Sequence, residues 1–151
     1  MLRLPKLNFP AIRLRARRQG AQVEIWDALR GQYLVLTPEE WVRQHLVAYL
    51  VSHCGAQPGR IVAEYAVALN GQPQRADVVV VDGCARPLLV AECKAPDVPV
   101  NEKVLSQVVR YNSVLGARYV VLTNGRVHGC YECRDGRYVP LAHFPDLTAG
   151  A

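Results

Sequence analysis

Three side chains that could take part in chemistry interrupt an otherwise apolar stretch of this sequence. Asp77 comes directly before the apolar run 78–81, and Glu92 and Lys94 come directly after the run 88–91. Two such runs separated by a short turn predict the paired strands of a β-hairpin. Because alternate residues of a strand share a face, Glu92 and Lys94 point to the same side of the sheet. The spacing therefore predicts two carboxylates and an amine gathered at one end of a sheet.

The register of this hairpin decides whether the two acids meet. If the turn is symmetric, Val80 pairs with Leu89 and Asp77 lies directly opposite Glu92. Directly opposed side chains lie roughly 5 Å apart at Cβ, and like charges at that distance repel each other. A divalent cation bound between the acids, with Lys94 as a catalytic amine, accounts for the arrangement. The alternative is three polar residues at strand ends exposed to water. A one-residue bulge would turn the acids to opposite faces.

Length and composition favour a single globular domain, 1–151. Half of the 151 residues are hydrophobic, and no apolar run approaches the roughly 18 residues that a membrane-spanning helix needs. The first six residues lack the apolar core of a secretory signal. We therefore expect a cytoplasmic protein with no membrane partner and a loose tail over residues 145–151.

The five cysteines are expected to be reduced thiols, because their number is odd and no secretion signal precedes them. Cys130 and Cys133 have the spacing of a zinc ligand pair, with His128 nearby. A structural zinc site needs four ligands and the sequence offers no second pair. In an extended segment these two thiols would also point to opposite faces. The sequence therefore argues against zinc.

A basic arm, residues 1–18, carries much of the net charge of +5. It holds six cations before the first acid, Glu24, whereas the remainder has 12 basic and 13 acidic residues. Cations in such an arm can bind the phosphates of a nucleic acid. They can also protect an exposed edge strand over residues 12–17, where apolar and basic residues alternate. Both interpretations stay open, and the candidate nucleic-acid-binding residues are Arg13, Arg15, Arg17 and Arg18.

The elements around these candidates predict a mixed α/β fold. We expect a mixed central β-sheet flanked by two helices, with an N-terminal β-hairpin. Thr37 and Asn101 are suitable N-caps for the helices, and Glu40 would complete a capping box with Thr37. Pro140 should end the last strand. The predicted helices are 38–53 and 102–115, and the predicted strands are 22–26, 32–36, 61–69, 74–81, 88–94, 118–123, 127–134 and 137–139.

Four further side chains could belong to the site. Gln107 and Tyr111 are four residues apart and so lie on one side of the second helix; the simpler interpretation is a surface glutamine beside a core tyrosine. Glu64 lies within the strand expected beside that of Asp77, where it would be either solvent-facing or a third metal-binding acid. Glu40 is already explained by its capping role.

The set Asp77, Glu92-Cys93-Lys94 and Gln107 to Tyr111 resembles the PD-(D/E)XK nuclease superfamily with its downstream QxxxY element. More narrowly, it is similar to the N-terminal endonuclease domain of the type I restriction enzyme R protein. The phrases 36–45 and 120–125 also resemble small stand-alone bacterial relatives of that domain. The resemblance covers residues 5 to 145. Residues 74–76 replace the proline and neighbours of the nominal motif, and no helicase motor accompanies the domain, so ATP-driven translocation is not implied.

The resemblance implies a restriction-endonuclease-like fold and a metal-dependent DNA endonuclease of the restriction-modification or DNA-processing type. Asp77, Glu92 and the Cys93 backbone carbonyl would hold Mg²⁺ or Mn²⁺, and Lys94 would orient or activate the attacking water. Gln107 and Tyr111 would position the DNA strand or the lysine. Glu40 matches the first-helix acid of the family and would contact the metal through water, and Glu64 is the other candidate for a further metal contact.

Two other functions are compatible with the same residues. The first is a non-catalytic module that binds nucleic acid or restriction-modification subunits on the same fold. The second is a homodimeric enzyme that resolves DNA junctions. Affinity for Mg²⁺ at Asp77 and Glu92 would separate the enzymes from the module.

Overall fold

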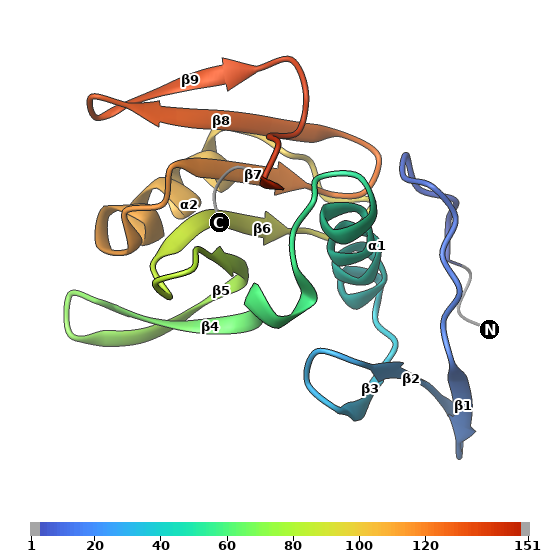
Figure 1. Cartoon of the computed structure of the whole chain (residues 1–151). Helices are drawn as coiled ribbons and strands as arrows, with labels where there is room; N and C mark the ends of the chain where they lie inside the picture. The colour runs from blue at the N-terminus through green and yellow to red at the C-terminus, as the bar shows by residue number, and fades with distance from the viewer. Residues whose placement is uncertain (1–3, 149–151) are drawn as a thin grey trace.

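The computed structural model describes residues 4–148. These residues form one mixed sheet, one antiparallel sheet and two α-helices. A six-stranded sheet has the strand order β4-β5-β6-β7-β8-β9, in which only the β6–β7 pair is parallel (Figure 1). The mixed α/β fold expected from the sequence is confirmed. The strands of this sheet are β4 (Ile61–Leu69), β5 (Gln72–Val81), β6 (Pro87–Cys93), β7 (Tyr119–Thr123), β8 (His128–Arg134) and β9 (Arg137–Leu141).

A separate three-stranded antiparallel sheet comes before the first helix. It consists of β1 (Ala16–Gln19), β2 (Gln22–Asp27) and β3 (Gln32–Val35), with β2 in the centre. The predicted hairpin is present as β2 and β3. The edge strand suggested over residues 12–17 begins only at Ala16, so the observed strand lies further toward the C-terminus than expected. Figure 1 shows the small sheet beside the helix end that follows β3.

Two helices lie on opposite sides of the six-stranded sheet. Helix α1 (Pro38–Ser52) begins at Thr37, whose side chain accepts a hydrogen bond from the Glu40 N–H at 3.0 Å. The Thr37 N–H donates to Val35, so only half of the predicted capping box forms. Helix α2 (Glu102–Leu115) is capped by Asn101 and ends at Gly116, whose φ of 67° favours glycine. A short 3₁₀ helix, η1 (Pro58–Arg60), leads into β4.

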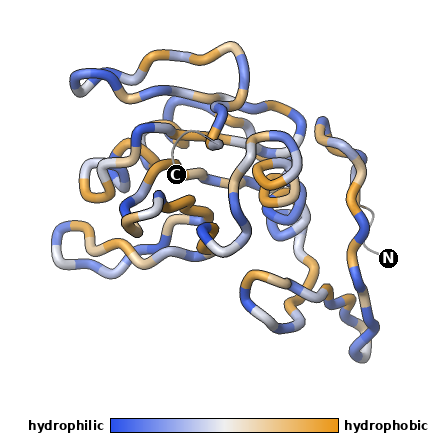
Figure 2. Tube along the Cα trace, viewed as in Figure 1, coloured by the Kyte–Doolittle hydropathy of each residue, from blue (hydrophilic) through white to orange (hydrophobic). Residues whose placement is uncertain are grey.

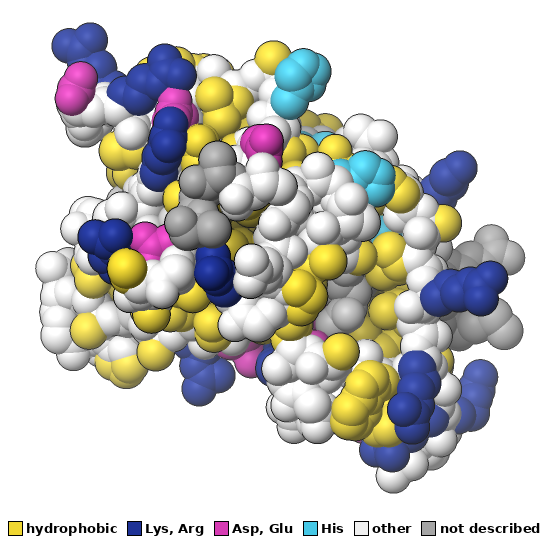
Figure 3. Space-filling view, in the orientation of Figure 1, with side chains coloured by type: hydrophobic (Ala, Val, Ile, Leu, Met, Phe, Trp, Pro, Cys, Tyr) yellow, Lys and Arg dark blue, Asp and Glu magenta, His cyan; other side chains and the backbone are white. Residues whose placement is uncertain are grey.

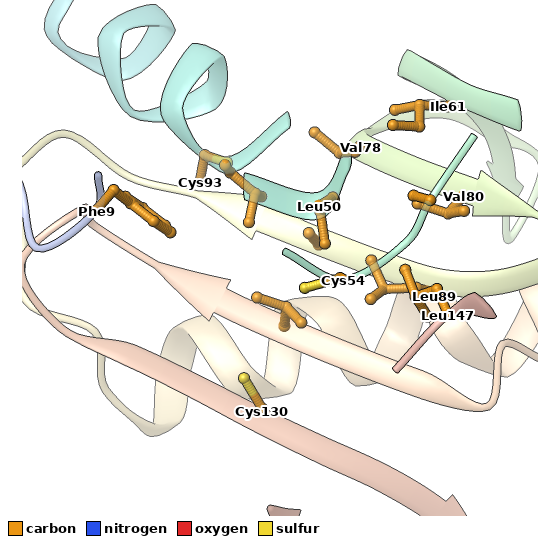
Figure 4. Packing of buried hydrophobic residues seen from close by; sticks show 14 of the residues in the cluster. Phe9, Leu50, Cys54, Ile61, Val78, Val80, Leu89, Cys93, Cys130 and Leu147 are labelled. Carbon is orange, nitrogen blue, oxygen red and sulfur yellow. The ribbon is translucent and has the colours of Figure 1, made fainter. Parts of the chain in front are cut away.

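Each helix buries an apolar stripe against one face of the sheet. Leu46 and Leu50 of α1 pack with alternate residues of the central strands, such as Val78 and Leu89 (Figure 4). Val108 and Tyr111 of α2 pack with the residues in between, in a second cluster. The central strands are therefore buried on both faces, and Figure 2 shows them as largely hydrophobic segments. A polar side chain within these strands is exceptional.

The register between β5 and β6 agrees with the prediction over the pairs that lead from the turn to the site. Val80 pairs with Leu89, and the two pairs toward the site keep the same register. A bulge does occur, but it lies between Val80 and Val81, on the turn side of these pairs. The strands therefore reach Asp77 and Glu92 in the symmetric register that brings the acids together.

Two predictions about the C-terminal part were wrong. Pro140 does not end the last strand, because β9 is an edge strand in which a missing N–H is tolerated. The tail is not loose over its described part: Leu147 is buried in the α1 cluster and its N–H donates to the Cys54 carbonyl at 2.7 Å. Residues 149–151 lie outside the described residues.

The basic arm also packs more closely than the sequence suggested. Leu7 and Phe9 are buried in the α1 cluster, and the Asn8 N–H donates to the Gly125 carbonyl at 2.7 Å. Residues 1–3 lie outside the described residues. Within residues 4–148, no helix is long and apolar enough to cross a membrane.

Candidate active site

Asp77 lies where β5 and β6 separate, and its carboxylate has two partners. One oxygen accepts a hydrogen bond from the Cys93 backbone N–H at 2.7 Å, and the other lies 3.5 Å from Nη2 of Arg43. The Asp77 side chain is only 14% exposed. Burial raises the pKa of this carboxyl, against the opposing effects of the Cys93 N–H and the Arg43 guanidinium. The strand therefore ends in an acid that the protein has removed from water.

Glu92 is more deeply buried and less well satisfied. Its Oε1 lies 3.5 Å from Nζ of Lys94, whereas its Oε2 is buried without a hydrogen-bond partner. Desolvation, followed by the negative charge of Asp77, raises the pKa of Glu92 to about 8. Its neighbours Ala91 and Cys93 pack in the α1 cluster, so alternation directs Glu92 to the α2 side of the sheet, while Lys94 follows the end of β6. The structure thus brings the predicted pair of acids and the amine together.

Arg43 is a site residue that the sequence reasoning missed. It is 7% exposed, and besides Asp77 its guanidinium lies 3.9 Å from Glu39 and 3.8 Å from Glu40. Its Nε and Nη1 are buried without hydrogen-bond partners. The available signal was its spacing of three residues from Leu46, which puts it on the apolar stripe of α1. A cation on that stripe indicates a buried anionic partner.

The two candidate third acids, Glu40 and Glu64, are held by a different arginine. Arg30, in the β2–β3 loop, donates to Glu40 at 2.8 Å and to Glu64 at 3.3 Å, and also pairs with Asp27. Glu64 has a φ of 54°, and its side chain is 42% exposed. Of the two alternatives left open for Glu64, the structure therefore agrees with the solvent-facing one. Glu40 also accepts from Gln44 at 3.3 Å, so its carboxylate is already well paired.

Gln107 and Tyr111 contact each other on α2, as their spacing predicts. Nε2 of Gln107 donates to the Tyr111 hydroxyl at 3.1 Å. Tyr111 is 6% exposed and packs in the apolar cluster between α2 and the sheet, while Gln107 is half-buried. This agrees with the simple interpretation of a core tyrosine beside a polar helix residue. Both side chains come from the helix that covers the sheet face of Glu92.

The donor set fits a hard divalent cation. Asp77 and Glu92 offer carboxylate oxygens and the Cys93 carbonyl offers another, which are ligands that Mg²⁺ and Mn²⁺ prefer. A buried oxygen without a partner, Oε2 of Glu92, is the kind of atom that a bound cation would satisfy. Among residues 4–148, no three His, Cys, Asp or Glu side chains are close enough to form a metal site by themselves. Water or substrate oxygens would have to complete the coordination.

Within the part of the chain that the structure describes, the candidate zinc ligands Cys130 and Cys133 and the arginines of the basic arm do not contact Asp77 or Glu92. All five cysteines are free, and burial raises the pKa of Cys130 to about 12, so this thiol is poorly suited to bind zinc at neutral pH. Arg15 and Arg17 stack over the aromatic rings of Trp26 and Tyr33 on the three-stranded sheet. Arg13 and Arg18 are exposed.

Comparisons with known proteins identify the family and the fold of this chain. A sequence profile of the family described as type I restriction enzyme R protein N terminus matches residues 38–145. The chain is also similar to the fragment structure of a protein described as an HsdR subunit of a type I restriction enzyme from Vibrio vulnificus YJ016. This match has a TM-score of 0.57 and 23% identity, covers 73% of this chain and takes up only 24% of the other. It confirms the expected restriction-endonuclease-like fold.

The type IIG restriction endonuclease BpuSI is a more distant neighbour. Its TM-score is 0.40 with 20% identity, over 68% of this chain and 12% of that one. No curated protein sequence matches the chain.

Proposed function

Because the chain belongs to the family of type I restriction enzyme R protein N-terminal domains, we propose that it is a metal-dependent DNA endonuclease. The observation that carries the proposal is the meeting of Asp77, Glu92 and Lys94 at the end of β5 and β6, with one buried Glu92 oxygen left without a partner. Few arrangements other than a cation-binding site explain two desolvated acids placed this close together.

The residues have distinct roles in this proposal. Asp77, Glu92 and the Cys93 carbonyl would hold Mg²⁺ or Mn²⁺, which when bound lowers the pKa of a coordinated water and stabilises charge on a phosphate. Lys94 is kept beside the acids by its contact with Glu92 at 3.5 Å. Its ammonium group would orient the attacking water and offset the negative charge that develops on the phosphate oxygens.

Three further residues act through position. The Cys93 N–H fixes one oxygen of Asp77, and the other oxygen lies 3.5 Å from Nη2 of Arg43. Arg43 favours the ionised form of Asp77 in a buried setting. Gln107, held by Tyr111, would contact the DNA strand or Lys94 from the α2 side. DNA is accordingly the proposed partner, with a second copy of the chain or restriction-modification subunits as further partners.

One observation favours a second candidate function, a non-catalytic module that binds DNA or subunits. Arg43 lies 3.5 Å from Asp77, so a resident cation already offsets part of the negative charge that a metal would neutralise. A site of this kind can persist as a purely structural ion pair. In that case the protein would bind its partner without any affinity for Mg²⁺ at Asp77 and Glu92.

Cleavage assays with matched variants test the proposal. The protein would be incubated with plasmid, single-stranded and branched DNA in Mg²⁺, Mn²⁺ or EDTA. We expect metal-dependent cleavage that falls by at least about 10³-fold in Lys94→Ala and Asp77→Asn, because both remove groups that act on the reacting phosphate. Lys103→Ala and Asp135→Asn, which change an exposed lysine on α2 and an exposed turn acid, should keep wild-type activity.

Two outcomes would contradict the endonuclease assignment. Equal cleavage by wild type and Lys94→Ala would indicate a contaminating nuclease. A calorimetric titration with Mn²⁺ that detects no binding to the wild type would favour the non-catalytic module. Metal binding that is lost in Asp77→Asn but retained in Asp135→Asn supports the proposed site independently of turnover.

A further inference from the structure

The excess of positive over negative charge lies entirely in the part of the chain that precedes α1. Residues 1–36 contain seven basic and two acidic residues, which accounts for the whole net charge of +5. Residues 37–151 contain 11 of each and are neutral. The family profile begins at residue 38, so the charged part lies outside the matched region. The six-stranded sheet and its two helices therefore have no excess charge of their own to attract a polyanion.

The outer face of the three-stranded sheet concentrates this charge over two aromatic rings. Alternation puts Trp26 on the opposite face from the buried Ile25, and Tyr33 is its cross-strand partner. The guanidinium carbon of Arg17 lies 3.8 Å from the centre of the Tyr33 ring, and that of Arg15 lies 5.4 Å from the centre of Trp26. Nε of Arg17 also donates to Glu24, its cross-strand partner, at 2.8 Å, which further fixes this guanidinium and leaves its two Nη groups to contact phosphate. Both arginines are exposed. Figure 3 shows the dark blue side chains gathered beside a hydrophobic group over this sheet.

The stacking determines which part of a nucleic acid this face can contact. Arginine residues cover Trp26 and Tyr33, so these rings are not free to stack on unpaired bases. Instead, they hold the guanidinium groups in fixed positions, which lowers the entropy lost when those groups bind phosphate. Protection of the edge strand β1 would explain charge alone, but it would not require aromatic rings beneath the charges. The arrangement suits the backbone of duplex DNA.

Two features show that this basic face lies near the candidate active site, a chain of ion pairs and a shared cavity. Arg30, in the β2–β3 loop, pairs with Glu40 of α1, and Glu40 lies 3.8 Å from Arg43 of the site. A cavity of about 370 Å³ lies between the arm and α1, and both Arg13 and Arg43 line it. DNA bound along the small sheet would therefore pass the side of the molecule where Asp77 lies.

We propose that the outer face of β1–β3, with Arg15 and Arg17, is a docking surface for the phosphate backbone of duplex DNA. The inference rests on the proposed function in naming DNA as the partner, but it concerns binding rather than cleavage. It explains why a neutral nuclease-like body carries a separate basic sheet ahead of its first helix.

The test compares two double variants that lower the net charge equally. Arg15→Gln/Arg17→Gln changes the stacked pair, and Arg110→Gln/Arg137→Gln changes two exposed arginines on α2 and β9. Binding of a fluorescein-labelled 20-base-pair duplex would be followed by anisotropy in EDTA, from 50 to 200 mM salt, so that cleavage plays no part. We expect the stacked-pair variant to bind roughly tenfold more weakly. Its salt slope should fall by about 2, since each lost duplex phosphate contact removes about 0.9. The other variant should match the wild type.

A pair of aromatic substitutions tests the stacking itself. Tyr33→Leu removes the ring beneath Arg17 and should weaken binding roughly two- to fivefold, whereas Tyr33→Phe keeps the ring and should bind as the wild type. Circular dichroism checks that each variant is folded. Equal losses in both double variants would overturn the inference, because they would reflect net charge alone. Tighter binding of single-stranded DNA or of RNA than of the duplex would overturn the assignment of the occupant.

Failure of this inference and failure of the proposed function give different results. If Mn²⁺-dependent cleavage is present but the stacked-pair variant binds DNA normally, the docking surface is wrong and the endonuclease stands. If binding depends on Arg15 and Arg17 but no metal-dependent cleavage occurs, the docking surface stands and the non-catalytic module is favoured.

Discussion

Arg30, partly buried beside α1, and Arg43, buried on α1 itself, differ in how completely they are paired. The Arg30 side chain is 15% exposed and directs its three donor nitrogens at three different carboxylates, those of Asp27, Glu40 and Glu64. The Arg43 side chain is 8% exposed, but its nearest acid oxygen is 3.5 Å away and two of its nitrogens have no partner. Proteins rarely leave buried polar groups unsatisfied without a reason.

The contrast distinguishes a structural ion network from a site that awaits a ligand. Around Arg30 the charges and hydrogen bonds are complete, so nothing further needs to bind there. Around Arg43 and Glu92, both a donor group and an acceptor oxygen are unpartnered. The missing interactions lie around the Asp77–Glu92 pair, where the family resemblance puts catalysis. Incomplete satisfaction is therefore the physical feature that marks the functional cluster.

The largest expected difference is in stability. Arg30→Met should lower the free energy of unfolding by roughly 3–5 kcal/mol, because it leaves the buried carboxylates of Asp27 and Glu40 without their cation. Arg43→Met should cost less, about 1–2 kcal/mol, because the loss of the Arg43–Asp77 ion pair is partly offset by removal of two unsatisfied nitrogens, and Asp77 keeps its hydrogen bond from the Cys93 N–H. Urea unfolding of the two variants at the same pH measures both values. Equal losses would mean that Arg43 is as well paired as Arg30 and would remove the contrast.

The pH dependence of stability provides a second test of the contrast. The pKa of Glu92 is raised to about 8, so between its unfolded value near 4.5 and pH 8 the folded state holds a proton that the unfolded state has lost. The stability that this carboxyl contributes is therefore present at low pH and lost as pH rises. Without metal, we expect a loss of roughly 2 kcal/mol between pH 6 and pH 8, at about 1.4 kcal/mol per pH unit.

Thermal unfolding in EDTA at several pH values measures this loss. Glu92→Gln cannot titrate and should remove most of the dependence, whereas Glu64→Gln, in the Arg30 network, should leave it unchanged. If the wild type becomes more stable from pH 6 to pH 8, the Glu92 carboxyl is already ionised in the folded protein. Its burial then does not raise its pKa as described.

Much of the six-stranded sheet and one half of the candidate site could be predicted from local patterns. Counting outward from the turn gave the correct pairing of Val80 with Leu89, because the bulge lies on the turn side of that pair. Asn101 caps α2 and the helix spans Glu102–Leu115 as predicted, since N-caps are encoded by neighbouring residues. Asp77, Glu92 and Lys94 could be found because acids and an amine stand out against apolar strands.

The remainder depends on contacts between distant segments, which no local pattern contains. Arg43 meets Asp77 only after α1 packs across the sheet, so its place on the apolar stripe indicates burial but does not identify its partner. Leu147 fits beside Cys54 through the same kind of long-range packing, so the tail was wrongly expected to be loose. The sequence could not choose between the two alternatives for Glu64, because its side chain pairs with Arg30, from a loop 34 residues earlier. Which arginine pairs with which carboxylate is therefore decided by tertiary packing.

The smallest expected effect comes from the exposed acids at the rim of each cluster, Glu39 near Arg43 and Glu64 near Arg30. Their side chains are 46% and 42% exposed, so neither substitution to Gln should change stability by more than about 1 kcal/mol. They should differ in metal affinity. Burial, followed by the nearby charge of Asp77, raises the pKa of Glu39. Glu39→Gln therefore removes negative potential from the site and should weaken Mn²⁺ binding roughly two- to fivefold. Glu64→Gln should leave Mn²⁺ binding unchanged, since Arg30 already neutralises that acid. Calorimetric titration at pH 8 measures both affinities, and equal effects would show that the two clusters share one electrostatic field.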